Sequence, residues 1–204
     1  MDSFPIIIFK IGVLVFSVMI HEIAHGMTAL KLGDETAKLS GRLTLNPLKH
    51  IDPIGSILVP LLFYFSGGGF FGWAKPVPYN PRALYKDFRY GPMKVALAGP
   101  FSNLALAVVF GLAVRFAGSF MDPLTIALVA FIVQLNCLLF VFNLLPIPPL
   151  DGSKLLLLVL PRQYALRFEM MGFQGLILII LFLSLFSGFI YRISDALTML
   201  LIGV

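Results

Sequence analysis

The chain has 204 residues, of which 59% are apolar and only 12% are charged, and its mean hydropathy is +0.96. A soluble globular domain is nearer half apolar and a quarter charged, so the composition excludes that class and indicates an integral membrane protein. The net charge is +5, and we expect the basic residues to lie in loops that face an anionic membrane leaflet. A nucleic-acid partner is not predicted, because the sequence has no Lys/Arg-rich run with interleaved aromatic residues.

Four segments are apolar and long enough to cross a bilayer as helices, since a spanning helix needs roughly 20 such residues. They are residues 4–30, 93–118, 123–146 and 173–191. We therefore predict an all-α polytopic membrane protein with four spanning helices.

Three shorter segments complete the predicted architecture. Residues 37–47 alternate weakly between apolar and polar, which predicts a short β-hairpin. Its second half either offers a strand edge to an extended substrate or merely connects the helices. Residues 54–65 are apolar but too short for a span, and they are predicted to be re-entrant or shallow. Residues 152–160 predict a short helix.

The first apolar segment contains the sequence His-Glu-Ile-Ala-His at positions 21–25. Histidines four residues apart lie on one helix face, where both imidazoles can bind one tetrahedral Zn²⁺. Glu22, beside the first histidine, is suited to take a proton from a zinc-activated water. Three ionisable groups in an apolar helix need partners, and this favours a metal site over a packing role.

A hydrolytic zinc needs a third protein ligand, and few carboxylates or histidines are available. Those in the polar connection after the first span are expected to be solvated loop residues: Asp34, Glu35, His50 and Asp52. Asp151 differs, because it lies between two apolar runs where Pro146, Pro148 and Pro149 prevent a regular helix. We predict Asp151 as the third ligand, with capping of the 152–160 helix as the alternative.

The motifs together resemble the site-2 protease family, the intramembrane zinc metalloproteases of peptidase family M50. The resemblance lies in HEIAH (21–25), AGPFSNLALA (98–107) and NLLPIPPLDG (143–152). LNPLKHIDPIGSI (45–57) and FGWAKPVPYNP (71–81) resemble compact prokaryotic members, and the sequence shows no PDZ or CBS-type segment.

The resemblance implies residue roles and a reaction. His21, His25 and Asp151 would bind one Zn²⁺ per chain, and Glu22 would be the general base. Asn143 would help to hold the substrate or the oxyanion, whereas Asn103 would be structural or lie on the substrate side. The expected function is hydrolysis of peptide bonds within or near transmembrane segments of membrane proteins. The alternatives are a membrane metal transporter and a proteolytically silent membrane scaffold.

The expected organisation is a single membrane-embedded domain over residues 1–204. Its catalytic core covers about 4–160, and a C-terminal helix covers 173–204. Basic residues concentrate in 31–52, 74–94 and 154–167, which indicates a cytoplasmic face under the positive-inside rule. We expect a multi-pass protein of a prokaryotic cell membrane with the active site nearer the cytoplasm. Its partners are the lipid bilayer and a transmembrane substrate, while a homo-oligomer is left open.

Overall fold

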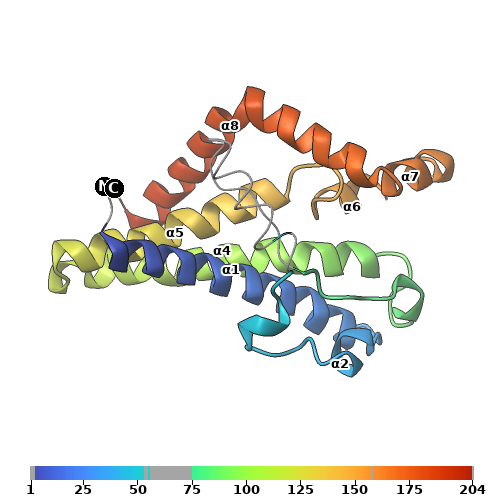
Figure 1. Cartoon of the computed structure of the whole chain (residues 1–204), viewed down its shortest axis with the longest axis horizontal. Helices are drawn as coiled ribbons and strands as arrows, with labels where there is room; N and C mark the ends of the chain where they lie inside the picture. Colours follow the sequence, from blue (N-terminus) through green and yellow to red (C-terminus); the bar gives the residue numbers. More distant parts are fainter. Residues whose placement is uncertain (1–2, 53–54, 56–74, 158, 204) are drawn as a thin grey trace. The chain divides into compact units, whose positions relative to one another are not determined.

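The structure is a computed structural model that describes residues 3–52, 55, 75–157 and 159–203 (Figure 1). The elements assigned in these residues are α1 (Phe4–Lys31), α2 (Thr36–Leu39), η1 (Pro47–Lys49), η3 (Pro81–Ala83), α4 (Gly91–Ala117), η4 (Gly118–Phe120), α5 (Pro123–Asn143), α6 (Ser153–Leu156), α7 (Arg162–Glu169) and α8 (Gly172–Ile202). The chain divides into two compact units, Met1–Gly91 and Pro92–Val204.

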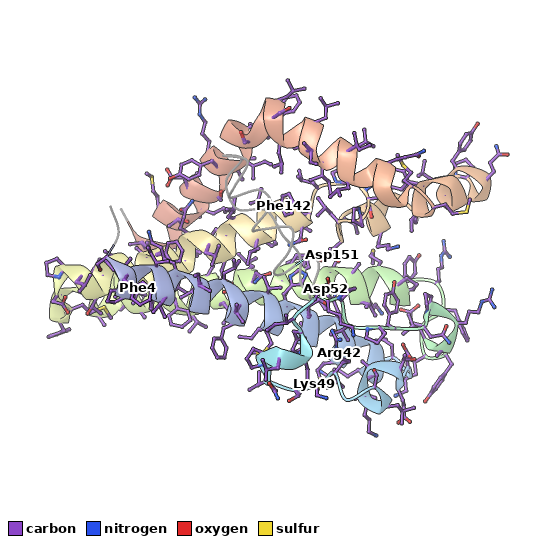
Figure 2. All side chains as sticks on the ribbon, in the orientation of Figure 1. Phe4, Arg42, Lys49, Asp52, Phe142 and Asp151 are labelled. Atoms are coloured by element: carbon purple, nitrogen blue, oxygen red, sulfur yellow. The ribbon has the colours of Figure 1, made fainter. Side chains whose placement is uncertain are left out.

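Four of these helices are long and apolar enough to cross a membrane: α1, α4, α5 and α8. They agree with the four predicted spans, and the protein is an integral membrane protein. Large apolar side chains cover their outer surfaces, as at Phe4 (74% exposed; Figure 2) and Phe116 (75% exposed). Lipid rather than water is the solvent that such surfaces fit.

α1 is the long helix of the first unit, and α2 and η1 pack against it. Pro5 lies in its first turn, where a missing N–H costs no hydrogen bond and the fixed φ suits a helix. Its buried residues concentrate toward the C-terminal half and include His21, His25 and Gly26. The helix ends at Lys31, and the chain reverses direction through Gly33 at a φ of 114°.

The second unit is held together by α4, α5 and α8. Ala107, Val133 and Cys137 are fully buried, and Phe110, Leu197 and Leu201 pack against them. Polar residues in this apolar interior are satisfied locally. In α8, Ser194 donates to the carbonyl of Ile190, and Thr198 donates to that of Ser194. These bonds satisfy the two hydroxyl groups within the helix, and α8 continues to Ile202, beyond the predicted span at 173–191.

The predicted β-hairpin at 37–47 is wrong, because these residues form helical turns, bends and irregular backbone and contain no strand. Hydrogen bonds between side chains and the nearby backbone favour a tight turn here over pairing with a second strand. The carboxylate of Asp34 accepts from the N–H of Thr36 where α2 begins, and the hydroxyl of Ser40 donates to the carbonyl of Thr36. Gly41 then reverses the chain at a φ of 63°. Residues 41–47 therefore offer no strand edge to an extended substrate.

Two further predictions concern short segments. The helix predicted at 152–160 is shorter, because α6 covers only Ser153–Leu156. Val159 and Leu160 still donate to the carbonyl of Leu156, closing the helix before Pro161. The predicted re-entrant segment at 54–65 lies outside the described residues, apart from residue 55.

Candidate metal centre

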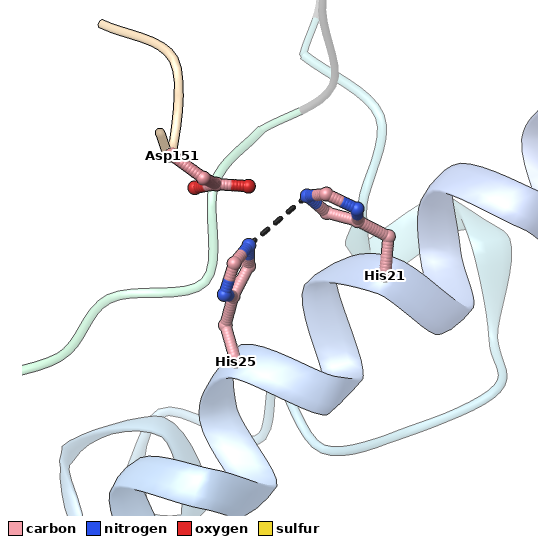
Figure 3. A group of neighbouring side chains, drawn as sticks. All are labelled: His21, His25 and Asp151. Atoms are coloured by element: carbon pink, nitrogen blue, oxygen red, sulfur yellow. Dashed lines mark hydrogen bonds between the residues drawn. The ribbon is translucent and has the colours of Figure 1, made fainter. Parts of the chain in front are cut away.

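His21 and His25 form a close pair on one face of α1 (Figure 3). Their Nε2 atoms lie 3.0 Å apart, and the rings meet edge to face with centroids 4.6 Å apart. Two nitrogens bound to one tetrahedral zinc at about 2.0–2.1 Å would lie about 3.3 Å apart. Both side chains are at least nine-tenths buried. The pair therefore fits two ligands of a single zinc ion.

Glu22 follows His21 on the same helix but contacts a different part of the first unit. Its Oε2 accepts a hydrogen bond of 2.7 Å from the backbone N–H of Val77. A carboxylate that accepts from an N–H makes a charge-assisted bond and is restricted in its orientation. The proposed general base is thus held beside the histidine pair by a segment 55 residues further along the chain.

Residues 75–80 have no regular secondary structure and contact the C-terminal half of α1 through Val77. The N–H of Lys75 donates to the carbonyl of His50 at 2.9 Å. The N–H of Asn80 donates to the carboxylate of Asp34 at 2.6 Å. Between these two points, the N–H of Val77 reaches Glu22. We call residues 75–80 the strap, because their backbone donors fasten them to three separate parts of the first unit.

The carboxylates and the histidine of the connection after α1 have hydrogen-bond or ion-pair partners within the first unit. Asp34 is buried, not solvated as predicted. Burial by itself opposes its ionisation, but hydrogen bonds from the Thr36 side chain and from the N–H groups of Asn80 and Thr36 lower the pKa of Asp34 overall.

His50 is also buried, and its Nε2 bonds to the carbonyl of Thr44. Asp52 accepts from the N–H of Gly55. Glu35 is exposed and pairs with Lys38.

Asp151 lies in the second unit, in the turn between α5 and α6, and is drawn in Figure 3. The turn is compact: Leu150 N–H donates to the carbonyl of Ile147, and the hydroxyl of Ser153 donates to that of Leu150. The N-cap of α6 is Gly152, and no side chain caps this helix. The structure therefore gives no support to helix capping as the reason for a carboxylate at 151.

Asn143 is the last residue of α5. Its Nδ2 donates to the carbonyl of Leu139 at 3.0 Å, and its own carbonyl accepts from the N–H of Gly152 at 2.7 Å. The structure thus brings His21, Glu22 and His25 together in the first unit. It separately ties Asn143 to the turn that carries Asp151 in the second unit.

Asn103 is fully buried between the helices of the second unit. Its Nδ2 donates to Oδ1 of Asn136 at 2.9 Å, and Nδ2 of Asn136 donates to the carbonyl of Ile132. This contact joins α4 to α5. It supports the structural one of the two roles that the resemblance implied for Asn103.

Two features of the site were missed at the sequence level. One is the backbone N–H of Val77, and the other is Arg42, which donates to the carbonyls of Lys75 and Pro76. A backbone donor has no residue type by which it can be found. The alternation of prolines at 76 and 78 is the signal that could have indicated an extended segment here.

Comparison with known proteins identifies the family of the chain. Residues 9–183 match the model of Peptidase family M50. The chain is 41% identical over 187 residues to the "Putative zinc metalloprotease YwhC" of Bacillus subtilis, covering 87% of this chain and 81% of that protein.

More distant relatives are longer than this chain. The "Putative zinc metalloprotease Rip2" of Mycolicibacterium smegmatis is 38% identical over 143 residues, which are 67% of this chain but 51% of that protein. The "Probable membrane metalloprotease ARASP2, chloroplastic" of Arabidopsis thaliana is 31% identical over 165 residues, covering 78% of this chain and 34% of that protein. No solved structure matches. The chain belongs to peptidase family M50, as a membrane zinc metalloprotease.

Proposed function

We propose that this protein is an intramembrane zinc endopeptidase of the site-2 type, which cuts peptide bonds within or near transmembrane segments of membrane proteins. The observation that carries the proposal is the position of the histidine pair. Two imidazoles spaced for one zinc lie in the C-terminal half of a 28-residue apolar helix. A metal site built into a spanning helix is suited to substrates that are already in the bilayer.

We propose His21 and His25 of the first unit and Asp151 of the second as the ligands of this zinc, because the sequences HEIAH and NLLPIPPLDG that contain them resemble motifs of the family. Two nitrogens and one carboxylate oxygen are a ligand set that catalytic zinc commonly has, with the fourth position left to water or substrate. When bound, the zinc supplies a Lewis acid for the scissile carbonyl and lowers the pKa of a water molecule to about 7.

We propose that residues 1–204 act as a single membrane-embedded metalloprotease domain, with its catalytic core over about 4–160.

The remaining chemistry belongs to side chains of the protein. Glu22 takes the proton from the attacking water and passes it to the leaving amine. Its Oε2 is held by Val77, which leaves Oε1 for this transfer. Asn143 uses one N–H for the carbonyl of Leu139, and its second N–H is the donor that we assign to the substrate carbonyl.

The site is proposed to lie near the cytoplasmic face. The N–H of Lys86 donates to the carbonyl of Leu32, and its Nζ donates to the carbonyl of Lys31. The basic segment that precedes α4 therefore lies at the C-terminal end of α1, where the histidine pair also lies. Basic segments favour the cytoplasmic side, so this end of α1 is assigned to it.

The test compares membranes from cells that carry wild-type, Glu22→Gln or Glu35→Gln protein. Glu35 is the matched control, because its carboxylate is exposed and pairs with Lys38 in α2. We expect quantitative proteomics to find transmembrane proteins that stay uncut with Glu22→Gln alone, while bound zinc is unchanged in all three. Identical processing in all three membranes, or zinc flux into proteoliposomes without any cleavage, would contradict the proposal.

A further inference from the structure

We propose that the backbone N–H of Val77 is a positioning group for Glu22, and that Arg42 and Gly26 hold this N–H in place. The inference rests on the proposed function, in which Glu22 is the general base. It assigns a role to the Pro-Val-Pro sequence at 76–78, which the metal site itself does not use.

The contact between Val77 and Glu22 is short and sheltered. The nitrogen lies 2.7 Å from Oε2, and the Val77 side chain is 6% exposed. A glutamate has three side-chain torsions, and a free carboxylate on α1 would sample several orientations. One strong hydrogen bond to a fixed backbone donor removes most of that freedom. The other oxygen of Glu22 is then presented in a defined direction.

The prolines on both sides make Val77 the sole donor of this tripeptide. Pro76 and Pro78 have no N–H, and each ring fixes its own φ near −65°. The backbone of the strap is therefore stiff at this point. A stiff segment with a single donor can hold one acceptor without competing for others, and here the acceptor is Glu22.

Arg42 binds the strap through the backbone carbonyls that precede Val77. Its Nη2 donates to the carbonyls of Lys75 at 2.6 Å and Pro76 at 3.2 Å. The side chain is only 6% exposed, so this guanidinium is committed to the two carbonyls instead of solvent. Because Pro76 directly precedes Val77, Arg42 controls the position of the N–H without touching Glu22.

Gly26 allows the strap to lie this close to α1. It is four residues after Glu22 and so lies on the same helix face. A Cβ at position 26 would lie 2.8 Å from Cγ1 of Val77 and 2.6 Å from Cδ2 of Leu43. Both distances are shorter than real Cβ contacts, so the side chains of Val77 and Leu43 would have to shift to admit a larger residue at position 26.

The sharpest test removes the N–H alone. Replacing Val77 by its α-hydroxy acid through nonsense suppression turns the amide into an ester and keeps the side chain. The matched control is the same exchange at Ala83, whose N–H bonds to the carbonyl of Asn80 within the connection. In the zinc-free protein, the wild-type minus Glu22→Gln infrared difference spectrum gives the carboxylate band of Glu22. We expect the ester at 77 to shift this band and the ester at 83 to leave it.

Activity gives the second readout, with a quenched transmembrane peptide that the wild type cuts. Losing a hydrogen bond to a charged group is expected to lower kcat about ten- to hundredfold, with KM and bound zinc unchanged. Val77→Pro should lose more activity than Val77→Ala, which keeps the N–H. An unshifted band and a wild-type kcat in the ester at 77 would overturn the inference. Full activity of Glu22→Gln would instead refute the proposed function.

Discussion

The N–H of Gly152 donates a hydrogen bond of 2.7 Å to the carbonyl oxygen of Asn143, closing the turn that carries Asp151. This bond satisfies a terminal carbonyl of α5 that has no partner within its own helix. It also fixes the turn of Asp151 to Asn143, so that the proposed substrate-binding amide and the proposed ligand carboxylate belong to one closed turn. A ligand on a closed turn is presented with little conformational freedom, as a metal site requires.

Gly152→Ala should open this turn. The residue has helical torsions that any side chain tolerates, so strain is not the reason. A Cβ there would lie 2.1 Å from the carbonyl oxygen of Leu144, and backbone must move to admit it. We expect a loss of about 1–3 kcal/mol in unfolding free energy and markedly weaker retention of zinc, measured by thermal denaturation and metal analysis. Gly12→Ala is the control, because nothing lies within 4 Å of its Cβ. Wild-type zinc content in Gly152→Ala would show that the turn does not position a ligand.

Zinc removal should affect stability as well as activity. A ligand that binds only the folded state stabilises it by about 4 kcal/mol when present at a thousandfold excess over its Kd. We expect chelation to abolish cleavage and to lower the midpoint of thermal unfolding, with both restored by added Zn²⁺. In His25→Ala, the chelator should change the midpoint far less, because one of the two paired imidazoles is missing. An equal shift in both proteins would place the stabilising metal elsewhere.

Asp34 should make the connection after α1 sensitive to acid. Its hydrogen bonds with Thr36 and Asn80 favour the carboxylate, so its pKa in the folded protein lies below the ordinary 3.8. The stabilisation is therefore complete above pH 3.8 and is lost as pH falls through the lower folded value. We expect Asp34→Asn to cost about 1–3 kcal/mol at neutral pH. The difference from wild type should shrink below pH 3.8, whereas exposed Glu35→Gln should cost little throughout.

Asn103 and Asn136 should act as a pair that joins two spanning helices. Their direct bond is buried among apolar residues, where such contacts contribute about 0.6–2 kcal/mol. A double-mutant cycle with Asn103→Ala and Asn136→Ala should give a coupling in this range. Bound zinc should be unchanged in all variants. Loss of cleavage without loss of stability in Asn103→Ala would instead place this residue on the substrate side.

The features that the sequence predicts well are local ones. A helix needs only a run of apolar residues, and the histidine pair needs only a spacing of four, so α1 and the pairing of its two histidines follow from the sequence itself. The turn at Asp151 was expected from its prolines, whose effect on the backbone is equally local.

The features that the sequence did not predict depend on partners distant in the chain or on competition between weak preferences. The Glu22–Val77 bond joins residues 55 positions apart through a backbone donor that every residue but proline has. The alternation of apolar and polar residues over 37–47 was too weak to favour a strand over the turn that the hydrogen bonds of Asp34 and Ser40 stabilise. Those bonds need no second strand, so the local turn was favoured.

The orientation of α1 can be tested at the two ends of α4. Phe88 precedes this helix and is 64% exposed, and Phe120 follows it and is 90% exposed. Because α4 is long enough to span the membrane, cysteines at these positions should lie on opposite sides. In intact cells, a membrane-impermeant maleimide should label Phe120→Cys and not Phe88→Cys, while opened cells should allow both. The native Cys137 is fully buried and should stay unlabelled. Labelling of Phe88→Cys in intact cells would place the histidine end of α1 outside, because the bond from Lys86 to Leu32 ties the two segments to one face.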